Sequence, residues 1–192
     1  MLGDDVVDLG DPDAAPGAVH PRFDARVFAA PEREWLAASG RPSRARWWLW
    51  AAKEAAYKRA RRLDPALPFH PRSFVVELDA TARRGRVCGP GGEAQVRLAR
   101  AGDALHAVAF GAGDDEARIA WGVAALAQGA DPSLAARALA TARVAARLGA
   151  RAQALRVERR DRIPALRLPD GRALALSLSH HGRFVAFAGA VG

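Results

Sequence analysis

Two long helical segments, each set among short strand-like segments, constrain the fold of this chain more than any other feature. The first covers about residues 44–62 and stops at a proline-rich stretch, with Ser43 as a candidate N-cap. The second covers 131–149, with Asp131 as a candidate N-cap, a proline at its first position and Gly149 at its end. The order of elements is therefore similar in the two parts of the chain.

Short alternating or β-branched segments surround both helices and are predicted to be strands. In the first part they cover residues 3–9, 73–80, 84–88, 94–100 and 104–111, with a short helix at 31–39. In the second part they cover 117–127, 154–159, 173–179 and 183–190. The polar, glycine-rich GAGDDE is the best candidate for a junction. We therefore predict an α+β fold of two similar halves, residues 1–112 and 113–192, each with a long helix packed on a mostly antiparallel sheet.

Composition places the chain among globular proteins of a reducing compartment. Half of the residues are hydrophobic, yet no apolar run approaches the roughly 20 residues of a membrane span. The N-terminus carries acids where an export signal would carry basic residues. Cys88 is the single cysteine and excludes an internal disulfide. These features predict a cytoplasmic protein without a membrane segment.

The net charge of +8 indicates an acidic partner such as nucleic acid, an anionic surface, an acidic protein or a phosphorylated ligand. The arginines are dispersed, and no zinc-ligand spacing, RNA-binding sheet motif or clear helix-turn-helix is present. Nucleic-acid binding is therefore a secondary hypothesis.

The segment WWLWAAKEAAYK, residues 47–58, contains the only two lysines of the chain, Lys53 and Lys58. On a helix Glu54 and Lys58 share a face, and the simplest interpretation is a surface ion pair worth a few tenths of a kcal/mol. The run of apolar residues before Glu54 instead predicts a helix that is buried on more than one side. Lysine, unlike arginine, can lose its proton when desolvated, so the two lysines suggest a specific chemical role.

Three acids, Asp4, Asp5 and Asp8, lie in the first predicted strand. Strand alternation places Asp4 and Asp8 on one face and Asp5 on the other. A frayed, acidic chain end is one interpretation. The alternative, with a helix carboxylate nearby, is a Mg²⁺ site, since Mg²⁺ commonly uses one or two carboxylates, waters and ligand phosphates.

The segment SLSHHGRF places Ser179, His180 and Arg183 near the end of a strand and its turn. Hydroxyl, imidazole and guanidinium groups together suit phosphate oxygens. No GxSxG elbow is present, so serine hydrolysis is disfavoured.

Together these motifs resemble the 4′-phosphopantetheinyl transferase superfamily. Its G-x-D, F-x-x-x-E, W-x-x-K-E-A-x-x-K and S-x-S-H motifs match GDD (3–5), FAAPE (28–32), WAAKEAAYK (50–58) and SLSH (177–180). The third motif is specific, and the others are weak alone. In the larger members the S-x-S-H half comes first, so the order here resembles a circular permutation. The resemblance and the length imply a pseudo-dimer within one chain, which we expect to be a monomer.

The resemblance also implies roles for single residues. Asp5 and Glu54 would bind Mg²⁺, with Asp8 or a water completing the shell, and Glu32 would have a supporting or metal-linked role. Lys53, Ser179 and His180 would bind coenzyme A, and Lys58 would be a base or a phosphate contact. Arg183, whose guanidinium suits phosphate, is a further candidate for binding coenzyme A.

Two positions depart from the family pattern. Val7 stands where some large members have a second acid, and Ile163 stands where they have the lysine of G-K-P. Arg160 or Arg162 are candidates to replace that lysine.

The implied reaction transfers the 4′-phosphopantetheine arm of coenzyme A to a serine of an apo acyl or peptidyl carrier protein, with Mg²⁺. A base is needed for the serine proton, and Lys58, Glu54 and a metal-bound water are the candidates. The positive charge suits an acidic carrier. The alternatives are a non-catalytic coenzyme A-binding module, which the departures at Val7 and Ile163 allow, and a basic nucleic-acid-binding domain.

Overall fold

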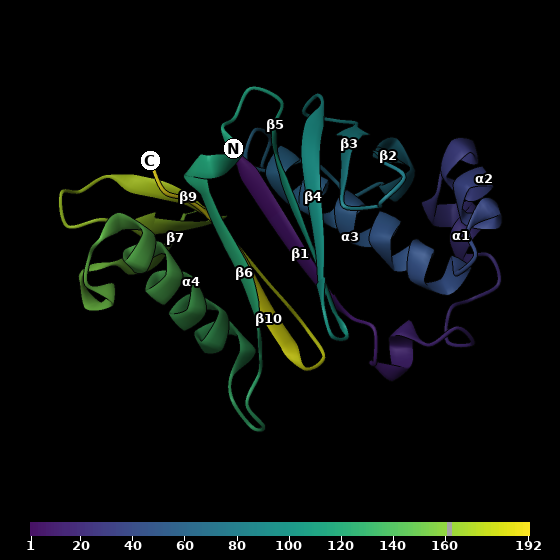
Figure 1. The fold of residues 1–192 in the computed structure, drawn as a ribbon. Coiled ribbons are helices and arrows are strands. Elements are labelled where there is room, and N and C mark those ends of the chain that lie inside the picture. Colours follow the sequence, from purple (N-terminus) through teal and green to yellow (C-terminus); the bar gives the residue numbers. More distant parts are fainter. Residues whose placement is uncertain (161–162) are drawn as a thin grey trace.

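The computed structural model describes residues 1–160 and 163–192, which form two antiparallel five-stranded sheets, each covered by one long helix (Figure 1). In the first sheet the strand order is β1-β5-β4-β3-β2, with β1 (Leu2–Asp8), β2 (Val75–Leu78), β3 (Arg84–Cys88), β4 (Ala94–Ala101) and β5 (Ala104–Gly111). In the second the order is β6-β10-β9-β8-β7, with β6 (Ile119–Ala125), β7 (Arg156–Arg160), β8 (Ile163–Arg167), β9 (Ala173–His181) and β10 (Phe184–Ala190). The predicted α+β class with two similar halves is confirmed.

Helix α3 (Pro42–Ala60) covers the first sheet and α4 (Pro132–Leu148) covers the second. The cap prediction for α4 is confirmed, since Asp131 Oδ1 accepts from Leu134 N at 2.9 Å and Gly149 adopts φ 64° at the end. For α3 the helix is confirmed, but the prediction of its N-cap is wrong. That helix begins at Pro42, so Ser43 lies inside its first turn and makes no cap. Proline is favoured at the first helical position because its φ is already helical and the N–H that it lacks would have no partner within the helix.

Two short helices, α1 (Phe23–Val27) and α2 (Ala30–Ala38), pack beside α3, and short 3-10 helices occupy several connections. Sequence reasoning predicted α2 but not α1. The predicted boundary at residue 112 falls between β5 and β6. The residue types of the segment RDRIP, 160–164, predict a turn, but Arg160 ends β7 and Ile163 begins β8, a strand that the sequence did not predict. Residues 161–162 of this segment lie outside the described residues. Among the described helices, none is long and apolar enough to cross a membrane.

A close approach of β1 to α3 positions the candidate site. Alanines such as Ala52 and Ala55 form the fully buried face of the helix. A Cβ at Gly3 would lie 2.2 Å from the carbonyl oxygen of Ala55 and 2.6 Å from the nitrogen of Arg59. Only glycine therefore allows this packing distance.

Strand β1 lies at the junction of the halves, with α3 on one face and β9 and β10 on the other (Figure 1). The predicted alternation is confirmed: Asp4 and Asp8 bond to the second half, and Asp5 bonds to α3. An apolar cluster joins the halves at the start of the strand and consists of Leu2, Val108, Phe110, Ile119 and Ala188.

Candidate functional site

The candidate site centres on an ion pair between β1 and α3. Lys58 Nζ donates to Asp5 Oδ1 at 2.8 Å and to the backbone oxygen of Asp4 at 2.9 Å. The side chains of Asp5 and Lys58 are 15% and 30% exposed, so both remain accessible at the surface. The close packing over Gly3 brings the helix and the strand near enough for this contact.

Glu54 lies one helical turn before Lys58 and is half-buried. Burial and the negative charge of Asp5 raise the pKa of Glu54 to about 7, although Lys58 opposes them. Burial also raises the pKa of Asp5, against the opposing effect of Lys58. The two carboxylates therefore share a region in which negative charge is unfavourable without a cation.

Lys58 is held in its charged form. Burial acts to lower its pKa, but the charges of Asp5 and Asp4 outweigh that effect and raise the pKa above its usual value. The side chain is therefore an ammonium group at neutral pH, with hydrogen-bond donors near a surface opening.

A cavity of about 180 Å³ opens beside Lys58 and is lined by both halves of the chain. Its lining residues are Lys58, Arg61, Arg62, Ile163, Pro164, Ser177 and Leu178. Arg62 Nη2 donates to the backbone oxygens of Pro164, at 3.3 Å, and of Leu176, and thereby joins α3 to β8 and β9. Sequence reasoning missed Arg61 and Arg62, although the basic run directly after Lys58 was a signal for them.

The donor set at this position fits a magnesium ion that keeps several waters. Within residues 1–160 and 163–192, no three His, Cys, Asp or Glu side chains lie together as a ready-made metal cage. Asp5 and Glu54 supply two carboxylates, and the charge of Asp5 raises the cost of ionising Glu54, which a divalent cation would relieve. Two carboxylates plus waters and phosphate oxygens are a common Mg²⁺ environment.

Asp8, the third predicted metal ligand, is not part of this group. Its carboxylate accepts from Nε and Nη2 of Arg183, at 2.8 and 2.6 Å, and from the backbone N–H groups of Arg183 and Gly10. Hydrogen bonds from Arg183 lower the pKa of Asp8 well below its usual range. Both oxygens are thus engaged on the opposite face of β1 from Asp5, and the structure favours a clamp between the halves over a metal ligand. Arg183 Nη2 also bonds Asp103, so most of its donors are engaged rather than free for a phosphate.

Ser179 and His180 lie on opposite faces of β9. Ser179 is buried, and its hydroxyl donates to Asp4 Oδ2 at 2.6 Å, while His106 Nε2 lies 3.1 Å from the same oxygen. Burial acts to raise the pKa of Asp4, but His106, Lys58 and Ser179 outweigh it and lower that pKa. His180 is exposed. The structure therefore places Ser179 in a buried polar junction between the halves, which sequence reasoning did not foresee for Asp4 and His106.

Lys53 is fully buried on the far side of α3 from Lys58. Its ammonium group lies 2.7 Å from Glu32 Oε1 and donates to the backbone oxygens of Pro71 and Phe74. Glu32 also accepts from the backbone N–H groups of Ala29 and Val76. All donors of Lys53 are thus engaged inside the core, so this placement favours structural support over contact with coenzyme A. Of the two roles predicted for Glu32, supporting or metal-linked, this placement favours the supporting one.

The positions that depart from the family pattern lie as follows. Val7 is buried in the core of the first half, and Ile163 lines the cavity beside Lys58. Arg160 is exposed at the end of β7, while Arg162 lies outside the described residues.

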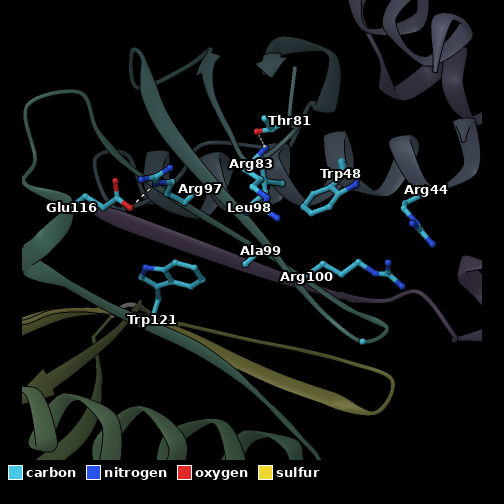
Figure 2. A pocket seen from close by; sticks show the side chains of 11 residues that line it. Arg44, Trp48, Thr81, Arg83, Arg97, Leu98, Ala99, Arg100, Glu116 and Trp121 are labelled. Atoms are coloured by element: carbon cyan, nitrogen blue, oxygen red, sulfur yellow. Dashed lines mark hydrogen bonds and ion pairs between the residues drawn. The ribbon is translucent and has the colours of Figure 1, made fainter. Parts of the chain in front are cut away.

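A different groove of about 800 Å³ is larger than the cavity beside Lys58, and none of the predicted site residues lines it (Figure 2). Size alone would favour that groove. The cavity beside Lys58 is nevertheless lined by Lys58 and Arg62, whose pKa values are perturbed, and by residues from two sequence motifs, so its chemistry makes it the better candidate.

Comparison with known proteins agrees with this assignment. The family model described as "4'-phosphopantetheinyl transferase superfamily" matches residues 1–110, which include Asp5, Glu54 and Lys58. No curated protein matches the chain significantly.

Proposed function

Because the chain belongs to the 4′-phosphopantetheinyl transferase superfamily, we propose that it transfers the 4′-phosphopantetheine arm of coenzyme A to a serine of an apo acyl or peptidyl carrier protein, with Mg²⁺. The observation that supports this most is the Asp5–Lys58 pair beside Glu54, at the mouth of a cavity lined by both halves. We propose that the protein acts in the cytoplasm as a monomer, since one chain supplies both sides of the cavity.

Asp5 and Glu54 are the side chains that would hold the magnesium ion. When bound, the ion supplies positive charge against the oxygens of the pyrophosphate that is cleaved. Lys58 and Arg61 add fixed positive charge on the cavity wall, where they bind phosphate oxygens. Arg62 has an indirect role, because its hydrogen bonds to the backbone of Pro164 and Leu176 hold β8 and β9 against the helix.

The carrier serine must lose its proton as its oxygen attacks phosphorus. Lys58 is a poor acceptor because its pKa is raised and it is already protonated. Without a cation the pKa of Glu54 is raised to about 7, and a metal ion bound to it would lower that value; its carboxylate is the better candidate for the base because it is the unprotonated partner of Lys58. We therefore propose that Glu54 accepts the serine proton and that Lys58 binds phosphate.

The test is incubation of the protein with coenzyme A, Mg²⁺ and a panel of apo carrier proteins, followed by mass spectrometry of each carrier. We expect a gain of one phosphopantetheine arm, which Glu54→Gln abolishes and Glu34→Gln, an exposed glutamate of α2, leaves unchanged. Lys58→Arg should keep more of the rate than Lys58→Ala, because it keeps the charge. A folded parent protein that modifies no carrier would contradict the proposal.

The second candidate is a module that binds coenzyme A without transferring the arm. Val7 in place of a family acid and Ile163 in place of a family lysine favour it. It predicts coenzyme A binding in calorimetry that Glu54→Gln barely changes in the presence of Mg²⁺, with no mass gain on any carrier.

A further inference from the structure

The two halves can be matched residue by residue through their strand registers. In the first sheet, Asp4 pairs with Val108, which pairs with Arg97. In the second sheet, Trp121 pairs with Ala188, which pairs with Ser177. The match starts from the first residues of β1 and β6, Leu2 and Ile119, which share one buried cluster. Trp121 thus occupies the position of Asp4, and Arg97 that of Ser177.

The next row of the two sheets follows the same rule. In the first sheet Asp5 pairs with Ala107, which pairs with Leu98. In the second sheet Gly122 pairs with Phe187, which pairs with Leu178. Ser177 and Leu178 line the cavity beside Lys58, and their counterparts Arg97 and Leu98 line the large groove. The groove therefore uses the strand positions that correspond to those of the Lys58 cavity, whereas its helix residues, Arg44 and Trp48, come from α3 and not from α4.

The corresponding positions of the second half lack the carboxylates of the Lys58 site. Gly122 stands in the place of Asp5. On α4, Arg143 and Arg147 have the spacing of Glu54 and Lys58, and both line a smaller cavity that shares Trp121 with the groove. The positions that correspond to Asp5 and Glu54 thus carry no carboxylate, so the second half does not repeat the pair of carboxylates that would hold a divalent cation.

The groove is strongly basic. Four arginines line it, namely Arg44, Arg83, Arg97 and Arg100. Glu116 is the one acid of the lining and is paired with Arg97 at 2.5 Å. In the described part of the chain, the guanidinium groups of the other three form no ion pair, and guanidinium groups bind phosphate through paired hydrogen bonds.

Two tryptophans supply flat apolar surfaces to the same groove. Figure 2 shows Trp48 of α3 and Trp121 of β6 on opposite sides of it, with Leu98 and Ala99 between them. Trp121 is 37% exposed, which is unusual for so large an apolar side chain. Indole rings beside arginines are typical of sites that stack a base and bind its phosphates.

We propose that this groove binds a phosphorylated nucleoside independently of divalent metal. The volume of about 800 Å³ lies in the range of small-molecule sites. The arginines recognise the phosphates, and the indoles recognise the base. The assignment is independent of the reaction proposed for the Lys58 cavity.

The test uses the full chain in EDTA and measures binding of adenosine 5′-diphosphate by calorimetry, beside inorganic pyrophosphate, a short single-stranded oligonucleotide and an acidic peptide. We expect the diphosphate to bind more tightly than pyrophosphate. The triple variant Arg44→Ala, Arg83→Ala, Arg100→Ala should weaken binding about 30-fold or more. Trp121→Leu should weaken it about tenfold.

Matched controls separate this site from general charge and from the Lys58 cavity. A triple variant at exposed arginines elsewhere, Arg33→Ala, Arg156→Ala, Arg159→Ala, removes the same charge and should keep the parent affinity. Lys58→Ala should also keep it, and circular dichroism checks that each variant is folded. The proposal is overturned if the diphosphate does not bind, if pyrophosphate binds as tightly, if only the oligonucleotide or peptide binds, or if Lys58→Ala abolishes binding while the groove variant does not.

Discussion

At the scale of single residues, Glu54 shows how the site maintains an unfavourable charge. Burial and Asp5 both oppose its ionisation, and only Lys58 favours it. A carboxyl group placed in this way destabilises the folded protein when it is ionised, and such a cost is typical of functional positions.

The pH dependence of stability tests this environment. The pKa of Glu54 is raised from 4.5 to about 7 on folding. Its contribution to stability is therefore full below about pH 4.5 and is lost as the pH rises through 7. Glu54→Gln should be more stable than the parent at pH 8, by on the order of 1–3 kcal/mol, and no more stable at pH 4. Urea unfolding at both pH values, without Mg²⁺, measures the difference, and a parent at least as stable at pH 8 would contradict the prediction.

The buried Lys53–Glu32 pair should behave differently from the pair at the site. Lys53→Ala leaves the carboxylate of Glu32 buried without its counter-charge, and we expect a loss of about 3–5 kcal/mol in urea unfolding. Lys58→Ala, at a side chain 30% exposed, should cost clearly less. The double variant Glu32→Gln, Lys53→Met should recover part of the loss. Equal effects at the two lysines would show that Lys53 is not a core residue.

At the scale of elements, the contact between α3 and β1 decides whether Asp5 and Lys58 meet. The helix was predicted from its apolar residues, and the strand from its alternation. The distance between them is set by Gly3, whose significance no local pattern in the sequence reveals, because the atoms that it contacts lie more than fifty residues away in the chain.

Gly3→Ala should separate the helix from the strand. The new Cβ would meet the backbone at Ala55 and Arg59, which cannot move without shifting α3. We expect a loss of about 2–3 kcal/mol and a marked fall in transfer rate, since the Asp5–Lys58 contact is disturbed as well. Gly17→Ala, where a Cβ would meet nothing within 4 Å, is the matched control and should change neither quantity. Thermal unfolding and the mass assay report both, and a fully active, stable Gly3→Ala would contradict this account.

At the scale of the whole molecule, the junction between the halves is both apolar and polar. Leu2 and Phe110 pack against Ile119, and Asp4 and Asp8 bond to the second half. Each half alone would expose this surface, and the first half would leave buried acids without their partners.

Fragments test this interdependence. Residues 1–112 expressed alone should be unstable or aggregate, because apolar surface and unpaired carboxylates would be exposed. Co-expression with 113–192 should restore a folded complex, and Asp8→Asn should weaken it. Circular dichroism and size-exclusion chromatography measure the outcome. A fragment 1–112 that is monomeric and as stable as the full chain would contradict the prediction.

The fold was predictable in its elements because these depend on local chemistry. Apolar runs and strand alternation are visible within single segments, and the cap at Asp131 needs only neighbours in sequence. The site was predictable in part. Asp5, Glu54 and Lys58 belong to motifs with the spacing of a strand and a helix, and the structure brings them together.

The remaining assignments depended on long-range contacts. Asp8, Arg183 and Ser179 suit phosphate or metal by residue type, but the structure engages them across the junction. Lys53 resembled a ligand contact, and only the packing of α2 and β2 around α3 shows that it is buried against Glu32. Residue type states what a side chain can bind, whereas the partner present in the folded chain determines what remains free to bind.

The sequence by itself thus determined most of the elements, the similarity of the halves, the family resemblance and the chemistry available at Glu54 and Lys58. The tertiary structure alone decided which polar side chains are used up in the interior, how close α3 lies to β1, and where the basic groove of Trp48 and Trp121 forms. The physical reason is that secondary structure and capping depend on residues within a few positions of each other. Burial, pKa and cavity shape depend on atoms brought together from distant parts of the chain.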